Sequence, residues 1–100
     1  MERVRAGRAL RVAFLAIGWA DYVFWQEEDQ SILARLNVLI EECRRNPFKG
    51  LGKPEPLKGE HRGWWSRRIT QSDRLVYRVV AKGDEQTLVI MQCRFHYDRR

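Results

Sequence analysis

The sequence predicts an α+β protein, a small sandwich in which a helical hairpin packs on a mainly antiparallel sheet in the order β-α-α-β-β-β. Two observations predict this class. Apolar residues recur at three- and four-residue steps between positions 32 and 43, which is typical of an amphipathic helix. After a loop that contains all the prolines, three short β-branched and aromatic segments follow one another, which predicts a meander of strands.

The N-terminal half supplies the first strand and both helices. We expect a strand over residues 10–17, a first helix over 18–28, and a second helix that ends at Asn46-Pro47. Asp29 and Ser31 can cap the second helix. The expected core contacts of the helices are Tyr22, Val23, Trp25, Ile32, Leu33, Leu36, Leu39, Ile40 and Cys43, with Trp19 and Trp64 as further core candidates.

The C-terminal half supplies the loop and the meander. Residues 46–63, "NPFKGLGKPEPLKGEHRG", are expected to form a long ordered loop. The strands are expected over 64–69, 74–80 and 87–95, with turns at "TQSD" and "AKGDEQ". Cys43 and Cys93 lie in apolar periodic segments, so two buried free thiols are expected, with a single disulfide as the alternative.

The composition favours one basic domain. One hundred residues suit a single core, which we place at 10–97, with a flexible basic extension at 1–9 and a short tail at 98–100. Lys and Arg number 19 against 13 Asp and Glu, a net charge of +6, which favours an anionic partner such as nucleic acid.

The start of the chain imitates a secretion signal, because arginines precede "VAFLAIGWA". That apolar run falls well short of the roughly 20 residues of a membrane span, and no clear cleavage pattern follows it. We therefore expect a cytoplasmic protein that does not enter a membrane.

Groups suited to RNA cleavage gather in four stretches, and the meander is expected to bring them to one sheet face. A metal-free cut needs a base for the ribose 2′-OH, cations for the phosphate charge, and an acid for the leaving 5′-oxygen. The candidates are Lys53, Glu55 and Lys58 in "KPEPLKG", Arg67 and Arg68 in "WWSRRI", Arg74 in "DRLVY", and Arg94, His96 and Tyr97 in "RFHY".

Glu55 is the candidate base, because its flanking prolines restrict the backbone. His96 is the candidate acid, since histidine titrates near neutral pH. Arg68 and Arg74 offer planar guanidinium groups to phosphate oxygens. Each also has a structural interpretation: Glu55 as a solvated loop acid, the arginines as exposed strand residues, and His96 as a strand-end residue with satisfied hydrogen bonds.

Two rings and three further cations complete the candidate set. Tyr97 and Trp65 are expected to stack on a splayed base, as recognition of single-stranded RNA commonly requires. Lys53, Arg67 and Arg94 are expected to contact RNA as additional cations.

Five stretches together resemble one known family. "DYVFWQEED", "RRNPFKGLGKPEPLKG", "GWWSRRIT", "DRLVYRV" and "CRFHY" stand in the order that marks the YoeB (Txe/YoeB) toxins of bacterial toxin–antitoxin modules. The resemblance runs from about Arg11 to Tyr97. One departure is Phe95, where many relatives carry tyrosine.

The resemblance implies a RelE-like fold and cleavage of mRNA in the ribosomal A site, without a cofactor or metal, so that translation is inhibited. It implies neutralisation by a YefM-like antitoxin, a complex that binds operator DNA, and a toxin homodimer. It assigns Glu55 as general base and Arg74 as the group that stabilises the scissile phosphate, assisted by Arg68. His96 and Tyr97 supply an acid and a stacking or orienting ring. It also places Lys58 beside the site as a contact of RNA phosphate.

A binding module is the alternative. The same scaffold without the catalytic set occurs in ParE-type toxins that inhibit DNA gyrase, and a nucleic-acid-binding regulator that acts with its antitoxin is a further option. These proteins have no need for Glu55, Arg74 and His96 together, so the sequence favours the nuclease.

Overall fold

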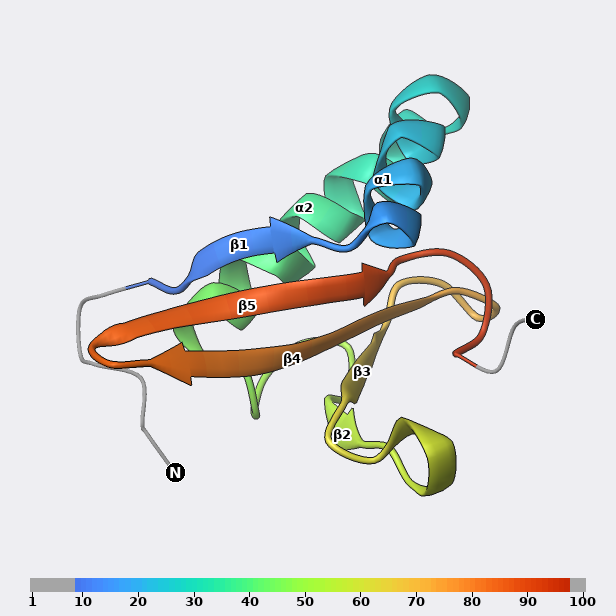
Figure 1. The fold of residues 1–100 in the computed structure, drawn as a ribbon. Coiled ribbons are helices and arrows are strands. Elements are labelled where there is room, and N and C mark those ends of the chain that lie inside the picture. Colours follow the sequence, from blue (N-terminus) through green and yellow to red (C-terminus); the bar gives the residue numbers. More distant parts are fainter. Residues whose placement is uncertain (1–8, 98–100) are drawn as a thin grey trace.

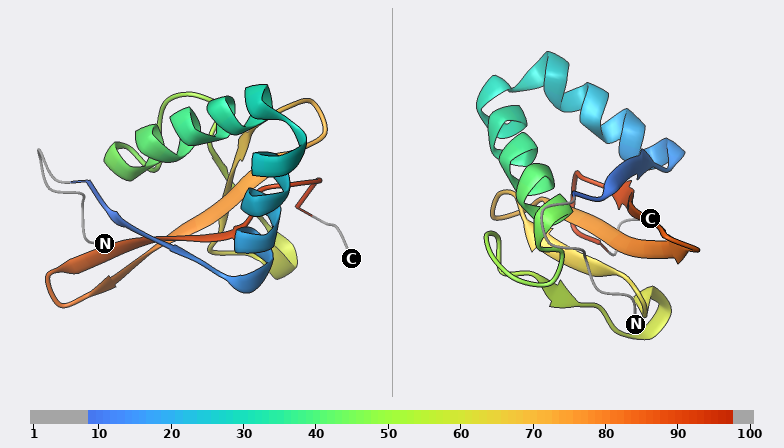
Figure 2. Two further views of the ribbon diagram at one scale, coloured as in Figure 1. Left: turned by 90° about the horizontal axis from the view of Figure 1, so that it is seen from above. Right: turned by 90° about the vertical axis from the view of Figure 1, so that its left-hand side faces the viewer.

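The computed structural model describes residues 9–97, which form a five-stranded mixed sheet covered on one side by two helices (Figures 1 and 2). The elements are β1 (Arg11–Phe14), α1 (Ala16–Glu28), α2 (Gln30–Arg45), β2 (Glu55–Pro56), the 3-10 helix η1 (Gly59–His61), β3 (Trp65–Arg68), β4 (Arg74–Lys82) and β5 (Glu85–Gln92). The predicted fold class is confirmed. The predicted extension and tail lie outside the described residues, except for Ala9.

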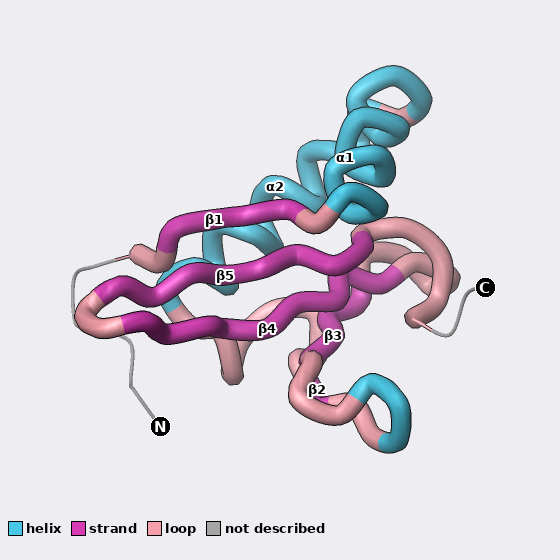
Figure 3. The backbone as a smooth tube through the Cα atoms, viewed as in Figure 1, coloured by secondary structure: helices cyan, strands magenta, loops and turns pink. Residues whose placement is uncertain are grey.

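The strands lie in the order β1-β5-β4-β3-β2. β1 runs parallel to β5, and every other pair is antiparallel. Figure 3 shows β1, β5 and β4 side by side in the sheet. The predicted order lacked β2 and η1, which both lie inside the segment expected to be a loop. β2 is two residues long because prolines flank and occupy it and cannot donate ladder hydrogen bonds.

The strand expected over 10–17 is present but shorter, because β1 spans Arg11–Phe14 and α1 already begins at Ala16. Gly18 lies inside α1 rather than at its start. A Cβ atom at this position would lie 2.6 Å from the backbone oxygen of Ile90. The glycine therefore lets α1 approach β5 closely, which a sequence pattern does not reveal.

The second helix begins as expected. The Asp29 carboxylate accepts hydrogen bonds from the backbone N–H groups of Ser31 at 3.0 Å and Ile32 at 3.1 Å. These bonds satisfy donors that have no partner inside the helix, and they lower the pKa of Asp29. No helix within residues 9–97 has both the length and the apolar run needed to cross a membrane.

The core lies between the helices and the sheet, and both cysteines are buried there as free thiols. Burial raises the pKa of the Cys43 thiol to about 11. Two tryptophans differ from expectation. Trp19 is 53% exposed and packs against the rings of Phe14 and Tyr22 instead of the core, and Trp64 is only half-buried.

A buried guanidinium joins the helical layer to the sheet. The side chain of Arg67 in β3 has no exposed surface, and its Nη1 donates to the Glu42 carboxylate of α2 at 2.6 Å. Its Nε donates to the Tyr77 hydroxyl on β4 at 3.2 Å. The remaining donors reach backbone carbonyls of the 46–51 segment. Arg67 therefore connects α2, the following loop and two strands.

Loss of Glu42 is expected to destabilise the fold, because a buried cation would lose its counter-charge. For Glu42→Ala we expect a decrease of about 3 kcal/mol in the free energy of unfolding, measured by urea denaturation at pH 7. Glu41→Ala is the matched control. Glu41 is one position away, more exposed, and paired with Arg44 on the helix surface, so its removal should change the value by less than about 1 kcal/mol. Equal effects of both variants would contradict this account.

The same interaction should depend on pH. The backbone N–H of Leu51 and then the Arg67 guanidinium hold the pKa of Glu42 below its ordinary value of 4.5. A lowered folded-state pKa stabilises the fold above the ordinary value, and this contribution is lost as pH falls through the folded pKa. The stability difference between the wild type and Glu42→Ala should therefore shrink between pH 6 and pH 3, as measured by urea denaturation across that range. A stability difference that stays constant over this pH range would contradict the expected pH dependence.

Candidate functional site

One sheet face carries the candidate chemistry. Alternate residues of a strand point to opposite faces, and Trp65, Arg67 and Tyr77 point toward the helices. Their neighbours therefore point to the other face, which we call the open face. It carries Trp64, Ser66 and Arg68 from β3 and its approach, and Arg74, Val76 and Arg78 from β4, of which Ser66 and Val76 are buried.

Glu55 reaches the open face through β2. It pairs with Ser66, so the two side chains share a face. Beside it lies a hollow of about 230 Å³ lined by Glu55, Pro56, Leu57, Lys58 and Tyr97. The structure thus brings the candidate base, a lysine and the terminal tyrosine to one cavity.

Arg68 and Arg74 are direct cross-strand partners at the neighbouring end of β3 and β4. Arg74 donates through Nη1 to three carbonyls of the 70–73 turn, at 3.0 to 3.2 Å. From strand spacing, the Cα atoms of Glu55 and Arg74 lie roughly 12 Å apart. Long side chains on one face span that separation, so both can reach one phosphodiester junction.

The C-terminal segment after β5 is fixed first at Cys93. The Asp21 carboxylate of α1 accepts from the Cys93 N–H at 3.0 Å, and the Trp25 indole donates to the Cys93 carbonyl at 2.8 Å. Both contacts are buried. Helix α1 therefore sets the point from which the last residues leave the sheet.

Four further hydrogen bonds hold this segment against the open face. The Gln92 amide nitrogen donates to the carbonyls of Arg94 and His96, each at 3.0 Å. The Phe95 N–H donates to Asp73 at 2.7 Å, and the Arg74 N–H donates to the Phe95 carbonyl at 2.9 Å. Sequence reasoning missed Gln92 and Asp73, because a strand glutamine and a turn aspartate carry no signal of such a role.

These contacts place three rings next to one another. His96 and Tyr97 lie with ring centroids 4.2 Å apart, and His61 meets the Tyr97 ring edge-on at 5.7 Å. His96 is exposed, and Tyr97 lines the hollow with Glu55. Tyr97 therefore connects the His96 ring to the hollow that contains Glu55, and the catalytic roles of these residues stay predictions.

Two of the expected RNA contacts are corrected. Arg67 cannot reach RNA, because its guanidinium is fully buried and hydrogen-bonded on the helix side. Trp65 also points to the helix side, where it packs on Phe48 at 4.8 Å and on the core, so it is not a stacking platform in the Glu55 hollow. The alternation of residue types in the sequence predicted a strand that contains Arg67 and Trp65, but it did not determine which face of that strand is buried.

The remaining expected RNA contacts stay predictions. The Arg94 guanidinium lies 3.5 Å from the ring centroid of Phe24 and 4.3 Å from that of Phe95, so it packs the C-terminal segment against α1. Lys53 is exposed in a left-handed backbone conformation two residues before Glu55. Lys58 lines the hollow itself.

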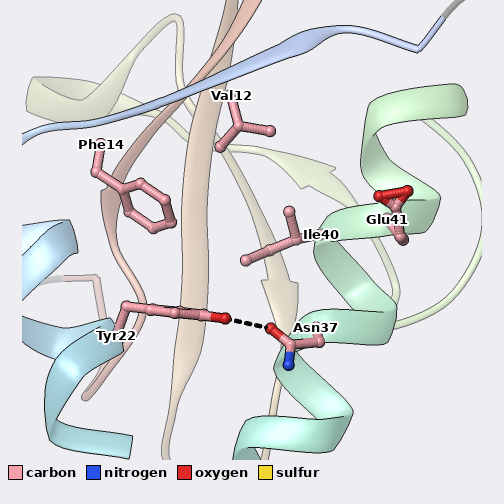
Figure 4. Close-up of a pocket in the computed structure, with 6 residues that line it drawn as sticks. All are labelled: Val12, Phe14, Tyr22, Asn37, Ile40 and Glu41. Carbon is pink, nitrogen blue, oxygen red and sulfur yellow. Dashed lines mark hydrogen bonds between the residues drawn. The ribbon is translucent and has the colours of Figure 1, made fainter. Parts of the chain in front are cut away.

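A second hollow, of about 340 Å³, lies between β1 and the helices (Figure 4). Val12, Phe14, Tyr22 and Ile40 line it with Asn37 and Glu41, and the Tyr22 hydroxyl donates to Asn37 at 2.7 Å. Its single carboxylate offers little for catalysis. Among residues 9–97, no three His, Cys, Asp or Glu side chains gather as metal ligands would.

The fold and this site define a class: a small basic α+β protein with a carboxylate, guanidinium groups, an imidazole and a phenol around the open sheet face. The family model for the YoeB-like toxins of bacterial type II toxin–antitoxin systems matches residues 14–97. The chain belongs to this family.

Individual members of the family are also similar to this chain. The toxin YoeB of Streptomyces coelicolor is 51% identical over 88 residues, which cover 88% of this chain and all of that protein. The solved YoeB/ParE toxin from Agrobacterium tumefaciens is 51% identical with a TM-score of 0.83, covering 88% of this chain and all of that one. Staphylococcus aureus YoeB, solved as a dimer and in a heterotetrameric YoeB–YefM complex, is 35% identical over 90% of this chain and all of its own, with TM-scores of 0.78 and 0.77.

Gln92 can be tested against a second glutamine of β5. Gln92→Leu removes two hydrogen bonds to the C-terminal segment and should lower the free energy of unfolding by about 1–2 kcal/mol, with faster amide exchange after Cys93. Gln86→Leu is the control. Its amide nitrogen is buried without a hydrogen-bond partner in the described part of the chain, so its loss should be neutral or stabilising. Urea denaturation and hydrogen exchange measure both, and unchanged exchange in Gln92→Leu would contradict the role.

Proposed function

We propose that this protein is the toxin of a toxin–antitoxin pair and acts in the cytoplasm as a ribosome-dependent endoribonuclease that cuts mRNA in the ribosomal A site. The observation that carries the proposal is the hollow shared by Glu55, Lys58 and Tyr97, with the His96 ring packed at a tilt against Tyr97. Family membership supports it, because the matched region contains every one of these residues.

The reaction follows from the chemistry of the groups. Glu55 takes the proton from the ribose 2′-OH, and the 2′-oxygen attacks the adjacent phosphorus. The bond from phosphorus to the 5′-oxygen breaks as the new bond forms, which leaves a 2′,3′-cyclic phosphate. His96 donates the proton that the departing 5′-oxygen needs, and Tyr97 orients the nucleotide by stacking. No step requires a metal or an organic cofactor.

Two guanidinium groups stabilise the negative charge that develops on the phosphate. Arg74 and Arg68 lie side by side on the open face, where planar donors can contact two phosphate oxygens at once. The Nη1 contacts of Arg74 with the turn hold its guanidinium in a fixed position before RNA arrives. Such preorganised donors stabilise charge that develops in the transition state without further rearrangement.

A YefM-like antitoxin is the proposed inhibitor. A basic surface with exposed rings suits an acidic, partly disordered segment that folds on binding and competes with RNA. We place this segment over Arg68, Arg74 and the C-terminal RFHY end. By analogy with Staphylococcus aureus YoeB, we also propose a toxin homodimer and an antitoxin-bound assembly, which binds operator DNA.

Removal of the base or of the phosphate contact should abolish most activity. Glu55→Gln and Arg74→Ala are each expected to slow mRNA cleavage about 100- to 1000-fold, measured by primer extension with purified ribosomes. Glu60→Gln is the control, since Glu60 is an exposed acid of the neighbouring η1 turn and should leave cleavage unchanged.

Two results would reject the nuclease. Cleavage by Glu55→Gln at the wild-type rate would remove the proposed base. Intact mRNA in the presence of the wild-type protein, together with blocked DNA supercoiling by gyrase, would instead support the ParE-type binding module.

A further inference from the structure

We propose that Arg78, stacked over Trp64, forms a binding subsite for a nucleotide next to the junction that is cut. This inference deepens the proposed nuclease function and rests on it. Neither residue belongs to the expected catalytic or RNA-binding set, and Trp64 was expected in the core.

The geometry places this pair on the same surface as the catalytic groups. The Arg78 guanidinium carbon lies 5.3 Å from the centroid of the Trp64 ring. Arg78 occupies the same side of β4 as Arg74, four residues away, which corresponds to roughly 13 Å along a strand. Trp64 precedes β3, and its carbonyl accepts from the Leu57 N–H at 2.9 Å, so it adjoins the segment that carries Glu55 and Lys58.

The arrangement resembles a prepared recognition element rather than a stabilising contact. Arg78 is exposed although the Trp64 ring lies next to its guanidinium, so the group is accessible to a ligand. Trp64 restricts that plane through a cation–π interaction, which reduces the entropy lost when a ligand binds. An RNA base can stack on a guanidinium plane, and the same group can donate to a phosphate.

The direction of the RNA follows. A strand whose scissile phosphate lies at Arg68 and Arg74 passes Glu55 and reaches Arg78 with a neighbouring nucleotide. The subsite therefore extends the stretch of RNA that the protein contacts. A short RNA that covers only the junction does not reach it. An acidic protein segment, in contrast to RNA, would interact with the positive charge of Arg78 and would not need the planar shape of its guanidinium.

The test measures RNA binding with cleavage removed. Fluorescein-labelled 2′-O-methyl RNA of two and of six nucleotides has no 2′-OH to attack, and fluorescence anisotropy gives its affinity for the purified chain. We expect Arg78→Ala to weaken the six-nucleotide RNA at least about fivefold and to leave the two-nucleotide RNA unchanged. The slope of log affinity against log salt should fall by about one.

Four further variants separate the physical causes. Arg78→Lys keeps the charge but not the plane, so it should weaken the longer RNA while the salt slope stays at the wild-type value. Trp64→Phe should weaken it less than Trp64→Leu. Arg45→Ala removes one exposed charge from the helical layer and should change neither RNA. Thermal unfolding checks that each variant is folded.

Several outcomes would overturn the subsite. These are no binding of the six-nucleotide RNA by the wild type, equal losses for both RNA lengths, or an equal loss in Arg45→Ala. Unchanged RNA affinity in Arg78→Ala with weakened antitoxin binding would assign the pair to the protein partner instead. Because these RNAs cannot be cut, a failure of the proposed nuclease activity would appear separately, as intact mRNA with unchanged anisotropy.

Discussion

The buried Arg67 guanidinium is the contact on which the arrangement of the site depends. It carries its charge into the interior, where desolvation is unfavourable unless every donor is paired. Here the donors reach Glu42 on α2, the Tyr77 hydroxyl and carbonyls of the 46–51 segment. That segment leads directly to Glu55. The position of the candidate base is therefore tied to the helical layer by one side chain that never contacts solvent.

The other end of the site is fixed in a different way. The backbone of the C-terminal segment is bound by Asp21 and Trp25 at Cys93, by Gln92 at two carbonyls, and by Asp73 at Phe95, and the Arg94 side chain packs the segment on Phe24 of α1. His96 is exposed, and the ring of Tyr97 lies against the rings of His96 and His61 beside the hollow that contains Glu55. Buried polar groups position the segment, and exposed rings and charges remain for a ligand.

The two faces of the sheet thus have different tasks. The helix side contains the core, both free thiols and the paired guanidinium of Arg67, so substitutions there act on stability. The open side contains Glu55, the Arg68–Arg74 pair, the rings of His96 and Tyr97, and the stacked Arg78. A linear RNA suits such a surface, because phosphates and bases alternate along it as charges and rings do here.

The sequence by itself determined the fold class, the two helices, the Asp29 cap, the meander and the family, because periodicity, capping and ordered motifs are local properties of the chain. It also selected Glu55, Arg74 and His96 by their chemistry. Only the tertiary structure decided which face each strand residue occupies. It assigned Arg67 and Trp65 to the helix side, exposed Trp19, and placed Gln92, Asp73 and the Trp64–Arg78 pair beside the candidate site. These properties depend on which layer covers a strand and on partners distant in sequence, and neither is encoded in a local pattern.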